Sequence, residues 1–364
     1  MNITNIFYPK NILSLFYCLT ISLKNKKAKN ILIINTEYIE KNFINKYLKK
    51  IYYEFDEIYF IKYKRLSLFK YKSIFQDIKI SDKNINTIKN IKLINHLIKT
   101  YKYINFYGNN DGLESYIFLK MKKNVNFHFI EHGHGNLLHF YLNRKKFKDV
   151  IKNFILKILF FINLTKGYPV KFESYYGSLA NTSMKLSING SHVKKVVYFR
   201  SLNKLFLKYF KKVKPTQKKL IWINLCDQTL KFNSFEFNKI LNFINVNLNK
   251  KNETLYIKYH PNKNYNWDNH FKKLLKFLKK EKIKFIIEKK QQSSIPIEII
   301  CLFYQIKKSY SFLSTSTLIN SFLIKGYKNY IFFNYTLNNS KVNQYSNLIK
   351  NFYLKNFKFN TKFI

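Results

Sequence analysis

The stretch NFHFIEHGHGNLL, residues 126–138, joins an apolar run to a loop that contains an acid, histidines and two glycines. The run has the length and side chains of a buried β-strand, and the polar residues begin where it ends. The stretch ETLYIKYHPN, residues 253–262, repeats this order in the second half of the chain. In open parallel sheets, ligands bind beyond the carboxyl ends of the strands. Both stretches therefore predict parallel sheets whose functional loops follow the strands.

Strand-like and helix-like segments alternate outward from these two stretches. In the first half we expect strands at residues 3–8, 31–34, 57–61, 103–107 and 126–130, and helices at residues 11–23, 39–50, 85–101 and 112–121. A second series of strands begins near residues 220, 252, 282, 309 and 329. This alternation is typical of α/β proteins with parallel sheets.

The chain of 364 residues is longer than one core of ~100–200 residues usually holds. Two domains that share a cleft are therefore expected. We predict an N-terminal domain at residues 1–190, a C-terminal domain at residues 191–345 and a closing segment at residues 346–364, and the sequence from residue 340 to the end is typical of a helix and a tail.

The formal net charge of +47 predicts anionic partners, such as a nucleotide, an acidic glycan or an anionic lipid surface. Only three of the 66 basic residues are arginines, and enrichment in Lys, Asn and Ile is what an AT-rich coding sequence produces. Part of the net charge is therefore attributed to coding bias and is not used to infer function. Lysines are spread along the whole chain without a zinc finger or an RNA-binding aromatic signature, so nucleic acid is not an expected partner.

The three cysteines are far apart in the sequence and predict neither a disulfide framework nor a cysteine-based metal site. This usage is typical of a reducing cytoplasm. The apolar run at residues 154–164 is shorter than the ~20 residues that cross a bilayer. Residues 144–164 mix basic and large apolar side chains, which favours a helix in an anionic membrane interface, while a core helix with solvated lysines is the alternative. We expect a cytoplasmic protein, attached peripherally to the inner face of the membrane.

The loop after residues 126–130 holds a candidate general base, Glu131. A carboxylate shielded at a strand end can have a raised pKa and accept a proton from a hydroxyl group. Gly133 would let the backbone approach a substrate closely. A solvated turn is the competing interpretation. The histidines His132, His134 and His139 match no known zinc spacing, so no metal is expected.

Donor-side residues are expected in the second half of the chain. His260, stiffened by Pro261, can donate to a phosphate oxygen as a nucleotide departs, although a capping or core histidine has the same pattern. Pro296 fixes a turn before Glu298, whose carboxylate can bind ribose hydroxyls or simply favour a helix start.

A run of hydroxyl side chains precedes the apolar helix pattern LINSFLI. Its members include Ser314, Thr315 and Ser316. Hydroxyls and helix N-terminal amides together can bind a phosphate, although serine and threonine are also good N-caps.

These motifs resemble those of the bacterial sialyltransferase and polysialyltransferase families, GT-B glycosyltransferases that use CMP-sialic acid. The acidic motif of those families is matched by Glu131, His132 and Gly133, and their His-Pro motif by His260 and Pro261. Their Ser-Ser/Thr motif is matched by two residues of the run 314–316. The opening stretch NIFYPKNILSLFYCL is also similar to the first strand, proline turn and helix of those enzymes.

The resemblance implies a GT-B fold, with two Rossmann-like domains whose parallel sheets face an interdomain cleft. It also implies metal-independent inverting transfer without a cofactor, from a nucleotide-sugar donor to a glycan or glycolipid acceptor of the cell surface. Glu131 would be the base and His260 would stabilise the departing CMP, with the hydroxyl run binding its phosphate. His132 stands where the family has a second acid, which leaves the transferred sugar open.

Two other functions fit the same sequence. A polyol-phosphate transferase of teichoic-type polymer synthesis would use a CDP-linked donor and a similar cleft, with His132 as the base. A non-enzymatic protein that binds polyanions or membrane surfaces would explain the charge but not the polar loops.

Overall fold

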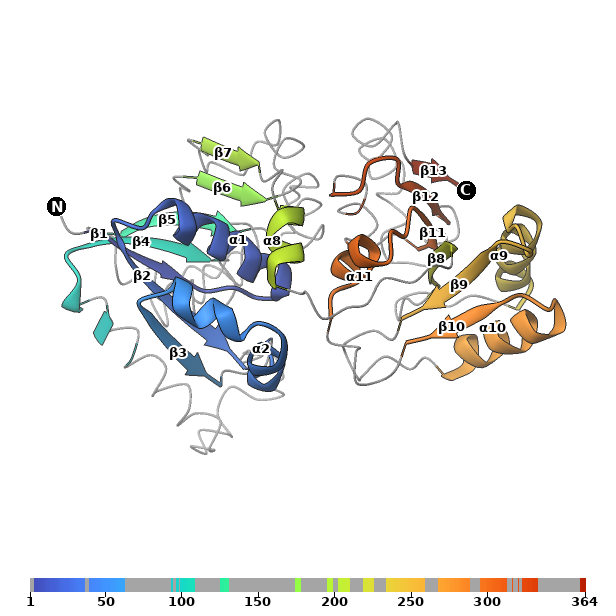
Figure 1. The fold of residues 1–364 in the computed structure, drawn as a ribbon, viewed down its shortest axis with the longest axis horizontal. Coiled ribbons are helices and arrows are strands. Elements are labelled where there is room, and N and C mark those ends of the chain that lie inside the picture. The colour runs from blue at the N-terminus through green and yellow to red at the C-terminus, as the bar shows by residue number, and fades with distance from the viewer. Residues whose placement is uncertain are drawn as a thin grey trace, which may run out of the picture. The chain divides into compact units, whose positions relative to one another are not determined.

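The computed structural model describes residues 3–36, 39–62, 99–108, 125–130, 174–177, 195–198, 202–209, 219–225, 234–258, 268–288, 295–312, 323–332 and 361–364, together with residues 93, 96, 97, 316 and 320. The chain divides into two units, Met1–Leu205 and Phe206–Ile364. Each unit is built around its own parallel sheet (Figure 1).

The first unit contains a seven-stranded parallel sheet in the order β3-β2-β1-β4-β5-β6-β7. Its strands are β1 (Ile3–Phe7), β2 (Lys29–Asn35), β3 (Glu57–Ile61), β4 (Tyr103–Gly108), β5 (Val125–Ile130), β6 (Ser174–Gly177) and β7 (Lys195–Tyr198). Its described helices are α1 (Ile12–Lys24), α2 (Lys41–Tyr47) and the 3-10 helix η1 (Lys49–Glu54).

Helix α1 begins at a capping box that the sequence encodes. The side chain of Asn11 accepts a hydrogen bond from the Ser14 amide at 2.8 Å, and the Ser14 hydroxyl accepts one from the Asn11 amide at 2.9 Å. Two of the N–H groups at the helix start are thereby satisfied. The helix is buried along nearly its whole length, from Ile12 to Ser22, which fits its almost wholly apolar sequence.

A ladder of asparagines fixes the register of the first sheet near its amino edge. Asn5 donates to Asn30 at 2.9 Å, Asn105 donates to Asn5 at 3.1 Å, and Asn126 donates to Asn105 at 3.2 Å. The four residues are register partners on β2, β1, β4 and β5. A slip of one residue would break these side-chain bonds and move the apolar side chains to the wrong face.

The second unit contains a six-stranded parallel sheet in the order β10-β9-β8-β11-β12-β13. Its strands are β8 (Lys219–Asn224), β9 (Glu253–Ile257), β10 (Phe285–Ile287), β11 (Lys308–Ser311), β12 (Lys328–Ile331) and β13 (Thr361–Phe363). Its described helices are α9 (Ser234–Asn247), α10 (Asp268–Lys280) and α11 (Ile297–Phe303), and α8 (Leu202–Tyr209) contains the division between the units.

Helices α9 and α10 cover one face of the second sheet. Their buried side chains, among them Phe237 and Leu278, form one core with alternate strand residues such as Leu255 and Tyr310. Because successive strand side chains point to opposite faces, Tyr256 and Lys258 face away from this core. Figure 1 shows α9 and α10 on one side of this sheet and α11 on the other.

Both sheets reverse the direction of strand addition at one point. The chain moves outward from β1 to β3 and then returns to place β4 beside β1, and the second sheet repeats this with β8 and β11. This is the doubly wound order in which ligands bind at the carboxyl edge near the reversal. The strands β1 to β5 and β8 to β12 that the sequence predicts are confirmed.

Two parts of the predicted domain organisation differ from the structure. The division lies between Leu205 and Phe206 instead of after residue 190, because β7 pairs with β6 and so extends the first sheet. Of the closing segment, the structure describes residues 361–364, where β13 pairs with β12 in place of the expected tail, and the predicted helix lies outside the described residues. None of the helices that the structure describes is both long and apolar enough to cross a membrane.

Candidate functional site

A buried ion pair lies at the carboxyl edge of the second sheet. Lys258 directly follows β9 and Glu288 directly follows β10. The Glu288 amide donates to the Ile257 carbonyl at 2.8 Å, so the parallel register sets the two side chains beside each other. The Lys258 Nζ lies 2.8 Å from Glu288 Oε2, and the two side chains are 7% and 0% exposed. The pair is therefore almost completely removed from water.

Two tyrosines support this pair. The Tyr256 hydroxyl donates to Glu288 Oε1 at 3.3 Å. The Tyr304 ring, just after α11, packs edge-on against the Tyr256 ring, with the centroids 5.8 Å apart. Burial and the Glu288 charge both raise the pKa of Tyr256, so its phenol stays protonated and remains a donor. Both oxygens of Glu288 thus have a donor.

A second buried carboxyl group, that of Glu298, lies in the first turn of α11. Pro296 precedes the helix at its N-cap position. The Ser316 hydroxyl and the backbone amide of Glu298 itself are hydrogen-bonded to the carboxylate. Lys258 is close enough that its charge favours ionisation of Glu298. Residues from three segments that are far apart in sequence thus meet at this edge.

The three side chains Lys258, Glu288 and Glu298 form what we call the carboxyl-edge cluster. Burial raises the pKa of Glu288 and of Glu298, and burial lowers the pKa of Lys258 although both carboxylates oppose that shift. One ammonium group faces two carboxyl groups, so full ionisation leaves a buried excess of negative charge. Perturbed pKa values of this kind gather at functional sites. Such a cluster can accept hydrogen bonds from hydroxyl or amino groups of a ligand.

The hydroxyl of Ser311 adds an unmatched polar group near the strand reversal. Ser311 is the last residue of β11 and the register partner of Asn224 on β8. Its side chain is fully buried, and its Oγ has no hydrogen-bond partner among the residues that the structure describes. A buried hydroxyl without a partner costs free energy unless a ligand or water satisfies it.

Aromatic rings stack along the carboxyl edge of the first sheet. The Tyr107 ring stacks on Phe7 and on His128, with centroids 4.8 Å and 4.4 Å apart. Burial and the nearby Tyr176 raise the pKa of Tyr107. At the end of the same strand, a Cβ on Gly108 would lie 2.7 Å from the Phe106 ring, so any other residue would force this buried ring to shift. This packing fixes the end of β5, from which the predicted base loop continues.

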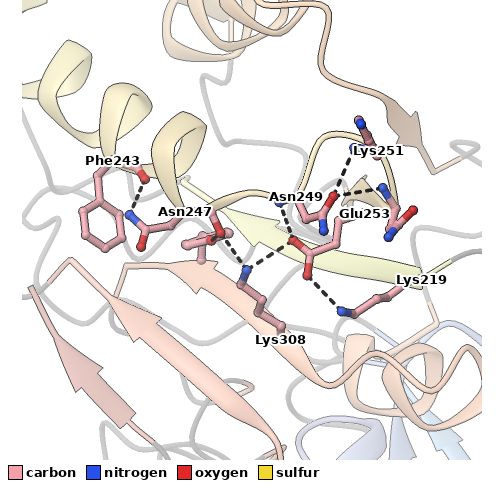
Figure 2. A network of polar contacts seen from close by, with 9 residues as sticks. Lys219, Phe243, Asn247, Asn249, Lys251, Glu253 and Lys308 are labelled. Carbon is pink, nitrogen blue, oxygen red and sulfur yellow. Dashed lines mark hydrogen bonds and ion pairs between the residues drawn. The ribbon is translucent and has the colours of Figure 1, made fainter.

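A different network of charges lies at the amino edge of the second sheet (Figure 2). Glu253 lies 3.2 Å from Lys219 Nζ and 3.3 Å from Lys308 Nζ, and it accepts a bond from the Asn249 amide at 3.0 Å. Lys308 also donates to the Asn247 carbonyl at 3.0 Å. We call Lys219, Glu253 and Lys308 the amino-edge network. Burial raises the pKa of Glu253, but the amide and the two lysines outweigh it and the net shift is downward.

The structure describes three of the predicted site residues and brings two of them together. Glu298 and Ser316 are hydrogen-bonded to each other, and Pro296 precedes the helix that carries Glu298. The predicted residues outside the described part of the chain are Glu131, His132, Gly133, His260, Pro261, Ser314 and Thr315. Residues 144–164 and the other loop histidines also lie outside it. Within the described part, no group of three or more His, Cys, Asp or Glu residues could hold a metal ion.

Sequence reasoning missed Lys258 and Glu288. Each is the first polar residue after an apolar strand, and the rule that ligands lie beyond strand carboxyl ends applies to both. Because the chain contains so many lysines, a single lysine before the His-Pro pair is a weak sequence signal. Glu288 ends the run KIKFIIE, and a glutamate at that place is one of only 19 acidic residues in the chain. That scarcity was the available signal.

No protein-family model matches the sequence, and no curated protein matches it significantly. Among solved structures, the UDP-GlcNAc 2-epimerase from Methanocaldococcus jannaschii has a TM-score of 0.50 at 10% identity, over 100% of this chain and 89% of that chain. A putative UDP-N-acetylglucosamine 2-epimerase from Listeria monocytogenes has a TM-score of 0.49 at 8% identity, over 91% and 80% of the two chains. The S. aureus MnaA–UDP co-structure has a TM-score of 0.47 at 12% identity, over 91% and 79%. At such identities the likeness concerns the fold, which is GT-B.

Proposed function

We propose that the chain is a metal-independent, inverting glycosyltransferase that moves sialic acid, or a related sugar, from a CMP-linked donor to a hydroxyl group of a cell-surface glycan. The GT-B fold supports the class of reaction, and the sequence motifs support the donor. The single observation that carries the proposal is the meeting of Glu298 and Ser316 at the carboxyl edge of the second sheet. Both residues were predicted from sequence to contact the donor nucleotide.

The carboxyl-edge cluster suits the uncharged part of a nucleotide. Two buried carboxyl groups and one ammonium group would repel a phosphate placed directly on them when both carboxyls are ionised. They are good acceptors for ribose hydroxyls and for the amino group of a base. The phosphate would lie toward the hydroxyl run at residues 314–316 and toward His260. This division assigns the base and ribose to the carboxyl-edge cluster and the leaving phosphate to the neighbouring loop.

In the proposed reaction, Glu131 accepts the proton of the acceptor hydroxyl while that oxygen attacks the anomeric carbon. The bond between this carbon and the CMP phosphate oxygen breaks, and its electron pair leaves with CMP. His260 and the hydroxyl run donate hydrogen bonds to the phosphate as its charge grows. The proton and the charge are thus balanced without a metal ion.

The donor class is tested by incubating the purified chain with CMP-, CDP- and UDP-linked sugars and measuring which free nucleotide accumulates. Release of CMP from the CMP-linked sugar supports the proposal. Release of CMP from the CDP-linked donor would favour the polyol-phosphate transferase, in which His132 acts as the base, because transfer of a polyol phosphate breaks the pyrophosphate bond. UDP-linked donors belong in the panel because one protein of similar fold is a UDP-GlcNAc 2-epimerase. Release of UDP alone would contradict the CMP assignment.

The site is tested by CMP binding to two matched variants of the second unit. Glu298→Gln should weaken CMP binding by roughly tenfold or more, because a hydrogen bond to a charged group contributes ~1.5–3 kcal/mol. Glu253→Gln changes the same residue type at the opposite edge of the same sheet and should leave CMP binding unchanged. Equal effects of the two variants would show that the carboxyl edge does not bind the nucleotide.

The role of Glu131 is tested separately from donor binding. Glu131→Gln should lower the transfer rate by ~10²–10⁴ while CMP binding stays within a few fold, because only the base is lost. His132→Ala should be milder. Transfer at the wild-type rate in Glu131→Gln would remove this residue from the mechanism.

A further inference from the structure

Helix α10 has a lysine at every fully exposed position between Phe271 and Lys280. These residues are Lys272, Lys273, Lys276, Lys279 and Lys280. We call them the α10 lysine face. The sequence suggested that lysines are merely spread along the chain. The folded helix instead collects five of them on one surface.

The α10 lysine face is directly opposite the buried side of the helix. At 3.6 residues per turn, its five lysines lie within an arc of about 120° centred away from Leu274 and Leu278. Both leucines are buried in the core of the second unit. Leu275 and Phe277, which are only partly buried, lie at the two borders of the arc. The helix of 13 residues is about 20 Å long, so the face spans several lipid headgroups.

Helix α9 provides an internal control for coding bias. It packs against the same core and is of similar length, and any coding bias would act on it in the same way. From Glu236 onward, where the structure describes its side chains, the exposed positions of α9 are Asn238, Lys239, Asn242, Val246 and Asn247. Such bias enriches asparagine and lysine alike, and α9 shows that mixture. The uniform choice of lysine on α10 therefore needs another explanation.

Within the part of the chain that the structure describes, no neighbouring carboxylate neutralises the charge of the α10 lysine face. None of its lysines forms an ion pair with a carboxylate that the structure describes. The acid that follows the helix, Glu281, lies 3.6 Å from Lys250 Nζ and accepts a bond from Asn245 at 3.0 Å. Only the last two lysines, Lys279 and Lys280, gain from the helix dipole. The face is therefore open to an external anionic partner.

We propose that the α10 lysine face binds the surface of an anionic lipid membrane. Lysine acts as a mobile point charge and suits a fluid layer of phosphate headgroups, whereas reading of nucleic acid favours arginine forks. The apolar borders at Leu275 and Phe277 suit the boundary between headgroups and acyl chains. Lys258 points to the opposite face of the sheet from the core that α10 shares, so docking through α10 leaves the carboxyl-edge cluster uncovered.

The proposal is tested by co-sedimentation of the full chain with vesicles, without any nucleotide, so its outcome is independent of the proposed enzymatic function. Vesicles of phosphatidylcholine alone are compared with vesicles that contain about one third phosphatidylglycerol. The wild-type chain should bind only the anionic vesicles and should be released by high salt. Changing the five lysines of the α10 lysine face to Gln should weaken this binding roughly 100-fold or more.

A charge-matched variant is the control. It changes five exposed lysines outside α10 to Gln, namely Lys26, Lys27, Lys49, Lys50 and Lys325. Both variants lose the same net charge, and Gln is a good helix former, so the thermal midpoint of the α10 variant should stay close to that of the wild type. The control variant should keep binding within a few fold. Equal loss in both variants would show a non-specific charge effect and overturn the proposal.

Two other outcomes would also overturn it. Unchanged vesicle binding by the folded α10 variant would mean that this face is solvated. Binding of single-stranded DNA that is tighter than vesicle binding and is lost in the α10 variant would identify a nucleic acid as the partner.

Discussion

The carboxyl-edge cluster and the amino-edge network belong to one sheet, yet their charges are balanced in opposite ways. At the amino edge, two lysines and a backbone amide surround the single carboxylate of Glu253, whose pKa is lowered. At the carboxyl edge, one lysine is the counter-charge of two buried carboxyl groups, whose pKa values are raised. The first arrangement stabilises the folded unit by itself. The arrangement at the carboxyl edge keeps an unfavourable electrostatic free energy in the folded unit. A bound ligand can reduce that free energy, which is typical of binding sites.

Lys258→Met should have the largest effect on the free energy of unfolding of the second unit. It removes the ammonium group of the carboxyl-edge cluster and leaves two buried carboxyl groups without their counter-charge, which costs about 3–5 kcal/mol. Urea unfolding followed by tryptophan fluorescence measures this unit selectively, because both tryptophans, Trp222 and Trp267, belong to it.

The double variant Lys258→Met with Glu288→Gln is the control for that prediction. It removes both charges of the pair and should recover part of the lost stability. A loss below about 1 kcal/mol in Lys258→Met would mean that the pair contributes no more than an exposed ion pair does.

Glu253→Gln should have an intermediate effect, a loss of about 1–3 kcal/mol, because several hydrogen bonds to a charged group disappear. The folded pKa of Glu253 lies below its ordinary value of 4.5. Its stabilisation is therefore present above pH 4.5 and is lost as the pH falls through the folded pKa. The difference in unfolding free energy between the wild type and the variant should shrink in the same acidic range. A difference independent of pH would mean that the carboxylate charge does not stabilise this edge.

Glu298→Gln should increase the free energy of unfolding by about 1 kcal/mol, whereas Glu253→Gln decreases it. The same change should weaken CMP binding. The folded pKa of Glu298 lies above its ordinary value of 4.5. The contribution of this raised pKa is present below pH 4.5 and is lost as the pH rises through the folded pKa. The free energy of unfolding of the variant should therefore increase relative to that of the wild type as the pH increases. Unfolding curves at several pH values measure this trend, and a variant that becomes relatively weaker at high pH would contradict it.

Lys219→Gln should have the smallest effect, below about 1 kcal/mol, since exposed ion pairs contribute little. The side chain of Lys219 is 69% exposed, whereas that of Lys308 is 18% exposed and also donates to the Asn247 carbonyl. Lys308→Gln should therefore be the more damaging change, and the difference between the two should persist at high salt. Equal effects would mean that burial does not distinguish the two lysines.

The strands of both sheets follow from local sequence. Runs such as LIWINL and NILIIN are apolar over the length of a strand, and burial of both sheet faces by helices requires that pattern. The three strands that the sequence did not indicate, β6, β7 and β13, have only three or four residues each and lie toward the ends of their sheets. At an edge, fewer neighbours cover a strand, so its sequence carries a weaker apolar signal.

The sequence by itself determined the α/β class and ten of the parallel strands. These features depend on residues that are close together in the chain. The pairing of Lys258 with Glu288, 30 residues later, and the concentration of lysines on one face of α10 were decided by the tertiary structure. Register between strands brings the first pair together, and packing of Leu274 and Leu278 into the core turns the lysines outward. Burial then sets the pKa shifts of the carboxyl-edge cluster, because only the folded chain removes its charges from water.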